Sequence, residues 1–139
     1  ITGTPEYHLL KPQGMSAGRF NSLQDWMDKA LIGVVRNDVT HHKIVRLGFK
    51  NIETLTDSEQ VLRLAIKGRI DAFPFNIKRV SLVCKKLFLH CAKFQSVRKL
   101  SESPTPDYFA TSINSDKALV NALKRAYEQL LSEGKLHKE

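Results

Sequence analysis

The sequence has little of what builds a membrane span or a catalytic site. No apolar run approaches the roughly 18 to 20 residues that cross a bilayer. It contains no Gly-x-Ser-x-Gly elbow, no phosphate-binding loop and no dinucleotide-binding glycine fingerprint. The five histidines are scattered, and no two carboxylates fall together in one predicted site, so acid–base catalysis has little support. The sequence therefore predicts a protein that is not an enzyme and that holds no metal or cofactor.

Cysteine is also scarce, since the chain contains only Cys84 and Cys91. Both fall in one predicted helix, where two unbroken turns separate their Cα atoms by about 10 Å. A disulfide spans no more than roughly 7 Å between Cα atoms. We therefore expect both cysteines to be small core residues on one face of that helix rather than bridged partners.

The composition is that of one ordinary globular domain, with 139 residues, 42% hydrophobic and 26% charged. The net charge is +8, but the densest basic stretch, residues 78–86, holds only four Lys and Arg. We therefore expect no nucleic-acid partner. The chain begins at Ile1 without a signal peptide, which we interpret as a processed or excised piece.

Apolar segments alternate along the chain between strand and helix patterns, which predicts βαβ units. We expect an α/β fold with a mostly parallel sheet and helices on both faces. The expected strands are residues 7–10, 31–35, 51–55, 69–75, 97–100 and 108–113. The expected helices begin at or near Ser22, Asp38, Asp57, Asn76 and Asp116, and the fourth of them runs to about Ala92.

The stretch 31–40 is the centre of this pattern, because an apolar strand ends there at a polar turn and a helix start. Ligands on parallel sheets bind outside the carboxyl ends of the strands. The turn after this strand and the end of the strand at 69–75 therefore give a predicted ligand site, made of Arg36, Asn37, Asp38, Thr40, Phe75 and Asn76.

Each of these residues also has a structural interpretation that the sequence leaves open. Asp38 can cap the following helix, contact a ligand, or do both. Arg36 can be an ordinary surface residue at a strand end, and Phe75 can pack in the core. Asn76 can be a helix cap.

Several segments together resemble the type II periplasmic solute-binding proteins, which serve ABC importers of amino acids and related solutes. Residues 22–26 (SLQDW) and 32–38 (IGVVRND) are similar to that family's "S-L-x-D-L … V-G-V-V-R-G-[TSD]" passage. Residues 64–72 (LAIKGRIDA) resemble its "L-x-x-G-R-x-D-A", and 108–112 (YFATS) its "Y-x-I-A-x-S". Residues 118–136 resemble its closing helix, and the matches lie in order over nearly the whole chain.

This resemblance implies two α/β lobes, joined by crossing strands, that close on a solute like a clamp. It makes residues 1–12 the first crossing strand, 13–107 the ligand-binding lobe, and 108–139 the second crossing strand and the C-terminal helix. The first lobe would be missing, so the chain would be a fragment or a partner chain would supply the other half.

The same resemblance implies a periplasmic protein that binds a small polar solute and delivers it to an ABC permease or a sensor partner. The alternatives are the effector-binding half of a transcription regulator with the same fold, and an interaction protein whose cleft binds another chain. A helix-turn-helix at the start of the full gene would identify the regulator.

Two positions depart from the family pattern and bear on the ligand. Asn37 and Asp38 stand where amino-acid-binding members have Gly-Thr or Gly-Ser, and Asn76 stands where an acidic residue often pairs with a ligand ammonium. The Asp38 carboxylate opposes an anionic group at this turn. We therefore expect a neutral, polar or cationic ligand group rather than a standard α-amino acid.

Overall fold

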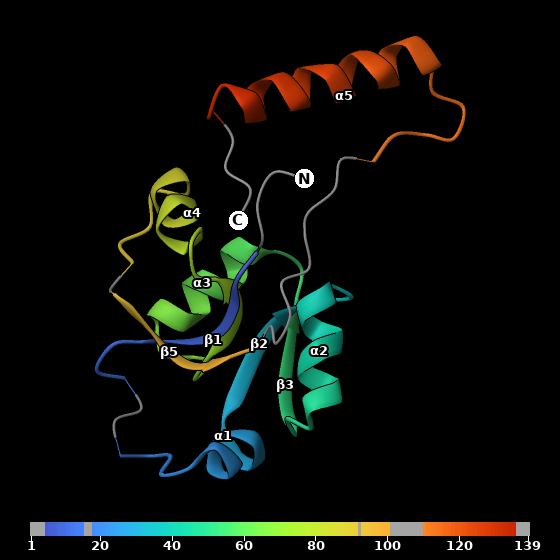
Figure 1. Ribbon diagram of the computed structural model, residues 1–139. Coiled ribbons are helices and arrows are strands. Elements are labelled where there is room, and N and C mark those ends of the chain that lie inside the picture. The colour runs from blue at the N-terminus through green and yellow to red at the C-terminus, as the bar shows by residue number, and fades with distance from the viewer. Residues whose placement is uncertain (1–4, 16–17, 92, 101–109, 136–139) are drawn as a thin grey trace. The chain divides into compact units, whose positions relative to one another are not determined.

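The computed structural model describes residues 5–15, 18–91, 93–100 and 110–135 (Figure 1). By its internal contacts the chain divides into two compact units, Glu6–Glu102 and Ile1–Pro5 with Ser103–Glu139. The first unit contains every strand and helix except the last. The elements in order are β1 (Tyr7–Pro12), α1 (Leu23–Lys29), β2 (Leu31–Val35), α2 (Val39–Leu47), β3 (Asn51–Leu55), α3 (Ser58–Ile66), β4 (Phe73–Asn76), α4 (Val80–Lys86), β5 (Phe94–Lys99) and α5 (Lys117–Ser132).

The strands form a three-stranded antiparallel sheet, β4-β1-β5, and a two-stranded parallel sheet, β2-β3. An isolated parallel bridge between Ile32 and Ala72 links β2 to the residue before β4. The predicted α/β class is confirmed, but the mostly parallel sheet is not. β1 accounts for the difference, because it lies between β4 and β5 and runs antiparallel to both.

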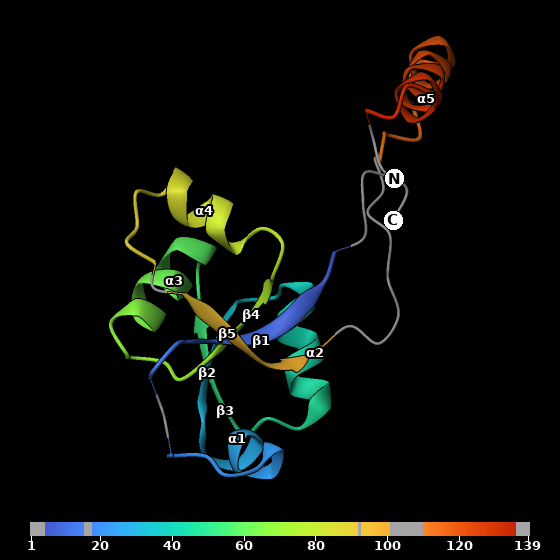
Figure 2. The ribbon, with the colours of Figure 1, turned by 60° about the vertical axis from the view of Figure 1, so that its left-hand side comes forward.

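Helices cover both faces of the strands, as predicted. Leu9 and Leu10, consecutive on β1 and both fully buried, point to opposite faces and enter different core clusters. The Leu9 cluster contains side chains of α1 and α2, and the Leu10 cluster contains side chains of α3 and α4. Figure 2 shows α3 and α4 on one side of the strands and α2 on the other.

The predicted capping residues Ser22, Asp57 and Gly48 are confirmed at the ends of their helices. The Ser22 hydroxyl accepts a hydrogen bond from the Asp25 N–H at 3.1 Å, so Ser22 caps α1. Asp57 caps α3 in the same way through the Gln60 N–H. Gly48 ends α2 with a φ of 91°, a left-handed conformation that suits glycine.

The long helix predicted from Asn76 to Ala92 is wrong. α4 begins only at Val80 and ends at Lys86, and Phe88 reverses the chain with a φ of 51°. The Leu89 N–H then donates to the carbonyl of Cys84 at 3.0 Å, which closes the helix end.

The early end of α4 also overturns the prediction that Cys84 and Cys91 are unpaired. Their Cα atoms are 6.0 Å apart and the two residues form a disulfide. The prediction assumed an unbroken helix of two further turns, whereas the reversal at Phe88 brings Cys91 back beside Cys84.

Three strands differ in extent from the prediction, and a fourth is not seen. The strand expected at 7–10 is β1 and extends to Pro12. The strand expected at 69–75 is β4, Phe73–Asn76, and Pro74 lies within it on the outer strand of the antiparallel sheet. The strand expected at 97–100 is β5 and begins three residues earlier. Of the expected crossing strand at 108–113, residues 108–109 lie outside the described part, and 110–113 form no strand.

In the second unit, α5 is an amphipathic helix capped by Asp116, whose carboxylate accepts from the Ala118 N–H at 3.1 Å. The described residues of its own unit bury no α5 side chain, so the apolar core face predicted for this helix stays a prediction. Leu119 is 56% exposed and Leu123 is 52% exposed. None of the helices in the described ranges is long and apolar enough to span a bilayer.

Candidate functional site

The polar ends of three strands meet at one edge of the first unit. β2 and β3 run parallel in register from Leu31 opposite Asn51 to Val35 opposite Leu55. The parallel bridge between Ile32 and Ala72 gives the segment leading into β4 the same direction. Because parallel strands share a carboxyl edge, the turn after β2 and the end of β4 lie at the same edge (Figure 1). Both carry predicted site residues.

The turn after β2 is held by backbone hydrogen bonds. The Arg36 N–H donates to the Leu55 carbonyl of β3 at 2.8 Å. Asn37 has a left-handed φ of 61°, which asparagine tolerates better than most residues, and its N–H donates to Nδ1 of His41 at 3.1 Å. Arg36 and Asn37 are both exposed, so both side chains are open to a ligand.

Asp38 is the N-cap of α2, which is one of the roles predicted for it. One carboxylate oxygen accepts from the Val39 N–H at 2.7 Å and the other from the Thr40 hydroxyl at 2.9 Å. Thr40 is only 5% exposed, so its buried hydroxyl fixes the orientation of the Asp38 carboxylate. A direct contact from either residue to a ligand stays a prediction.

Phe75 and Asn76 lie at the end of β4 and are both half-buried. Phe75 packs against the Leu10 cluster, with its ring edge-on to Phe73 at 6.1 Å between centroids. The Oδ1 of Asn76 accepts from the backbone N–H of Lys78 at 3.1 Å. Asn76 therefore closes the turn before α4 and does not cap that helix, which begins four residues later at Val80.

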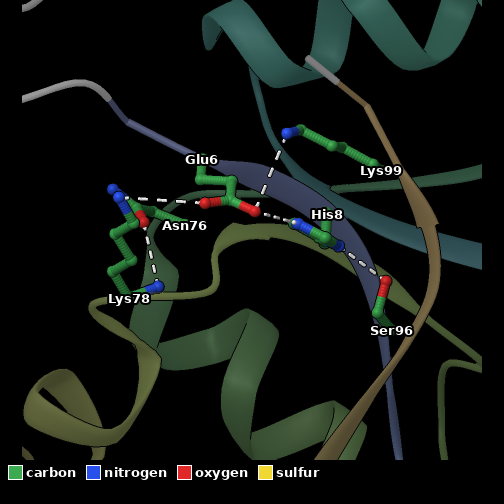
Figure 3. A network of polar contacts seen from close by, with 6 residues as sticks. All are labelled: Glu6, His8, Asn76, Lys78, Ser96 and Lys99. Carbon is green, nitrogen blue, oxygen red and sulfur yellow. Dashed lines mark hydrogen bonds and ion pairs between the residues drawn. The ribbon is translucent and has the colours of Figure 1, made fainter. Parts of the chain in front are cut away.

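A charged network that the sequence did not predict adjoins Asn76 (Figure 3). Tyr7 lies opposite Asn76 on β1, and the preceding Glu6 accepts from the Ile77 N–H through its carbonyl at 2.9 Å. The Glu6 carboxylate lies 3.0 Å from Nε2 of His8. It also lies 3.8 Å from the ammonium groups of Lys78 and of Lys99.

Three separate segments supply the network, so no local motif indicated it. Glu6 and His8 flank the start of β1, Lys78 follows β4, and Ser96 and Lys99 belong to β5. The only sequence signal is the absence of acidic residues from 72 to 101, which leaves Glu6 as the counterion for nearby lysines.

His8 also contacts Ser96, with 2.6 Å between Nδ1 and the Ser96 hydroxyl. A Ser–His–carboxylate chain is the arrangement of many hydrolases, which also need aligned donors for an oxyanion. Here the Glu6 carboxylate also contacts two lysines. His8 and Ser96 lie on the paired strands β1 and β5. We interpret these contacts as a link between β1 and β5 that fixes the position of Glu6, just before the start of β1.

The hydrogen bond with His8 is the largest cause of the lowered pKa of Glu6. Burial opposes it as the second-largest effect, and the charges of Lys99 and Lys78 lower the pKa further. A lowered pKa in the folded state means that the ionised carboxylate stabilises the fold above the ordinary glutamate pKa. That stabilisation disappears as the pH falls through the lowered pKa.

We therefore expect Glu6→Gln to melt below the parent protein at pH 7, and the two melting temperatures to converge in acid below the ordinary glutamate range. Thermal unfolding followed by circular dichroism between pH 2 and pH 8 measures this. Glu53→Gln is the control, because Glu53 is exposed on β3 and has no ion-pair partner within the described ranges. A gap for Glu6→Gln that persists unchanged at the acid end would contradict the assignment.

Asp71 has a structural role. Its carboxylate accepts from the Leu31 N–H at 2.8 Å and from the Arg19 guanidinium at 2.9 Å. It thereby ties the segment before β4 to the start of β2. Among the described residues, no group of three or more His, Cys, Asp or Glu side chains could hold a metal ion.

No protein-family model matches the sequence, and no curated protein matches it either. Solved structures do match. An ancestral arginine-binding protein bound to arginine has a TM-score of 0.65 at 14% identity, over 94% of this chain and 56% of that one. A probable amino-acid ABC transporter extracellular-binding protein from Bacillus subtilis has a TM-score of 0.68 at 13% identity, over 94% and 55%.

A third structure, an amino acid ABC transporter substrate-binding protein from Streptococcus pneumoniae bound to L-arginine, has a TM-score of 0.68 at 16% identity, over 94% of this chain and 53% of that one. The chain thus spans about half the length of the solved proteins it matches. At these identities the likeness establishes the fold and not the ligand. The chain has the type II periplasmic-binding fold of amino-acid ABC transporter substrate-binding proteins, over about half of their length.

Proposed function

We propose that this chain contributes one side of a binding site for a small polar solute, in a two-lobed receptor of the ABC-transporter type. The observation that carries the proposal is the meeting of the Arg36–Asp38 turn and Asn76 at the carboxyl edge of the sheet. Solute sites of open α/β sheets lie at that edge. The likeness of the fold to proteins bound to arginine supports a solute site in this chain.

The Asp38 carboxylate at this edge favours a ligand with a cationic or neutral polar group. Asp38 supplies a carboxylate, and each of its oxygens can accept a further hydrogen bond beyond those from Val39 and Thr40. Asn76 adds an uncharged amide beside it. Two of the matched structures are bound to arginine, whose guanidinium is such a cationic group.

The mechanism that we propose is closure of two lobes around the solute, without catalysis. A ligand that contacts both lobes stabilises the closed state through the contacts it makes only there. A second lobe would cover the exposed apolar face of α5. The matched proteins have room for such a lobe, because this chain spans only about half of their length. Either a longer form of this chain or a partner chain would supply that lobe.

By the same likeness we propose a periplasmic or extracellular location and delivery of the solute to an ABC permease or a sensor partner. The fold also suits the effector-binding half of a transcription regulator. The full gene distinguishes the two, because a signal peptide supports the receptor and an N-terminal helix-turn-helix supports the regulator.

Ligand-induced thermal stabilisation of the full-length gene product tests the proposal. We expect the carboxylate-free amine agmatine to raise the melting temperature more than L-arginine or L-glutamine does. Asp38→Ala and Asn76→Ala should each weaken binding of the active compound about ten-fold, because each removes a ligand hydrogen bond worth about 1 to 2 kcal/mol.

Ser22→Ala is the matched control for Asp38→Ala. It also removes a helix N-cap, at a cost of about 1 kcal/mol, but α1 precedes β2 and so lies at the opposite edge of the sheet. Ser22→Ala should lower stability and leave ligand affinity unchanged. If none of the three compounds raises the melting temperature, or if both variants bind as the parent does, the proposed site is wrong.

A further inference from the structure

A hollow lies between α4 and the start of β5, and its lining includes Ile77, the residue that follows Asn76. Its volume is about 430 Å³, within the range of small-molecule sites. The walls are largely apolar and come from Val80 of α4, Leu89 of the following loop and Phe94 of β5. The Cys84–Cys91 disulfide forms part of the lining and joins that loop to α4.

The polar groups of this pocket are a hydroxyl and two cations. Ser81, Lys85 and Lys93 line it together with the apolar side chains. Both lysines are exposed, and neither forms an ion pair within the described ranges. No carboxylate close to them in the sequence can neutralise them, because residues 72–101 contain seven Lys and Arg and no Asp or Glu.

We propose that this pocket binds an amphipathic monoanion, an apolar body that carries one carboxylate. The apolar walls would bury the body and thereby remove it from water. The Lys85 and Lys93 ammonium groups at the rim would pair with the carboxylate. No residue of this pocket belongs to the predicted solute site, but Ile77 directly follows Asn76, so the two sites are neighbours.

Binding of decanoate below its micelle concentration tests the proposal. We would measure it by isothermal titration calorimetry on the full chain with its disulfide intact. Decanol tests the need for charge and decylamine tests its sign. We expect decanoate to bind at least ten-fold more tightly than either. The double variant Lys85→Ala, Lys93→Ala should bind decanoate about ten-fold more weakly, since an exposed ion pair contributes a factor of up to about five.

The matched control is Lys67→Ala, Lys86→Ala, which removes the same charge from exposed positions outside the pocket. It should bind as the parent does. Leu89→Ala should also weaken decanoate, with the lysines intact. An equal loss in the two double variants, or equal binding of decanol and decanoate, would overturn the proposal. So would binding to phosphatidylglycerol vesicles without binding of free decanoate, which would identify a membrane-contact surface instead.

Discussion

Phe73→Ala is expected to lower the free energy of unfolding by about 3 to 5 kcal/mol. Phe73 is fully buried at the first position of β4, and it is the largest side chain in the core with no exposed surface. Its ring stands edge-on to Phe94 at 5.1 Å and to Phe75 at 6.1 Å between centroids. Truncation would leave a cavity among strands whose positions are fixed by pairing, so the surroundings could close it only in part. Urea unfolding followed by circular dichroism measures the change.

Phe88→Ala is the matched control, because it removes the same atoms from a side chain that is 95% exposed. We expect its effect on the free energy of unfolding to stay within about 0.5 kcal/mol. Equal losses for Phe73→Ala and Phe88→Ala would mean that the Leu10 cluster is not packed as described.

Removal of the Cys84–Cys91 disulfide is expected to cost about 2 to 3 kcal/mol. The bridge closes a loop with a sequence separation of seven, and that loop gains this much chain entropy in the unfolded state when the bridge is absent. The double variant Cys84→Ala, Cys91→Ala should therefore unfold at a lower urea concentration than the parent protein.

Reduction of the parent protein with dithiothreitol should give a similar loss, whereas the double alanine variant should not respond to the reductant. Thiol titration of the unreduced, denatured parent provides an independent check. Two reactive thiols per chain in that titration would contradict the disulfide directly.

Local patterns in the sequence were enough to predict most elements of the first unit. Apolar runs identified β2 and β3, and capping residues such as Ser22, Asp38 and Asp57 marked the helix starts. These features depend on backbone hydrogen bonds within three or four residues, so they are visible in a short window of sequence. The motif resemblance likewise led to the type II periplasmic-binding fold, which the solved structures confirm.

Contacts between residues far apart in the sequence could not be predicted from local patterns. The pairing of β1 between β4 and β5 joins residues about 60 to 90 positions apart, and it turned the expected parallel sheet into a mixed arrangement. The Glu6 network has the same origin, because its members meet only after that pairing.

By itself, then, the sequence determined the α/β class, the helix caps and the polar turn at Arg36–Asp38, because each depends on neighbours along the chain. Only the tertiary structure decided strand direction, the Glu6 counterions and the Cys84–Cys91 bridge. The bridge is the clearest case. A helix end at Lys86 and a left-handed Phe88 shorten the Cα separation to 6.0 Å, and no spacing rule for a continuous helix could reveal that reversal.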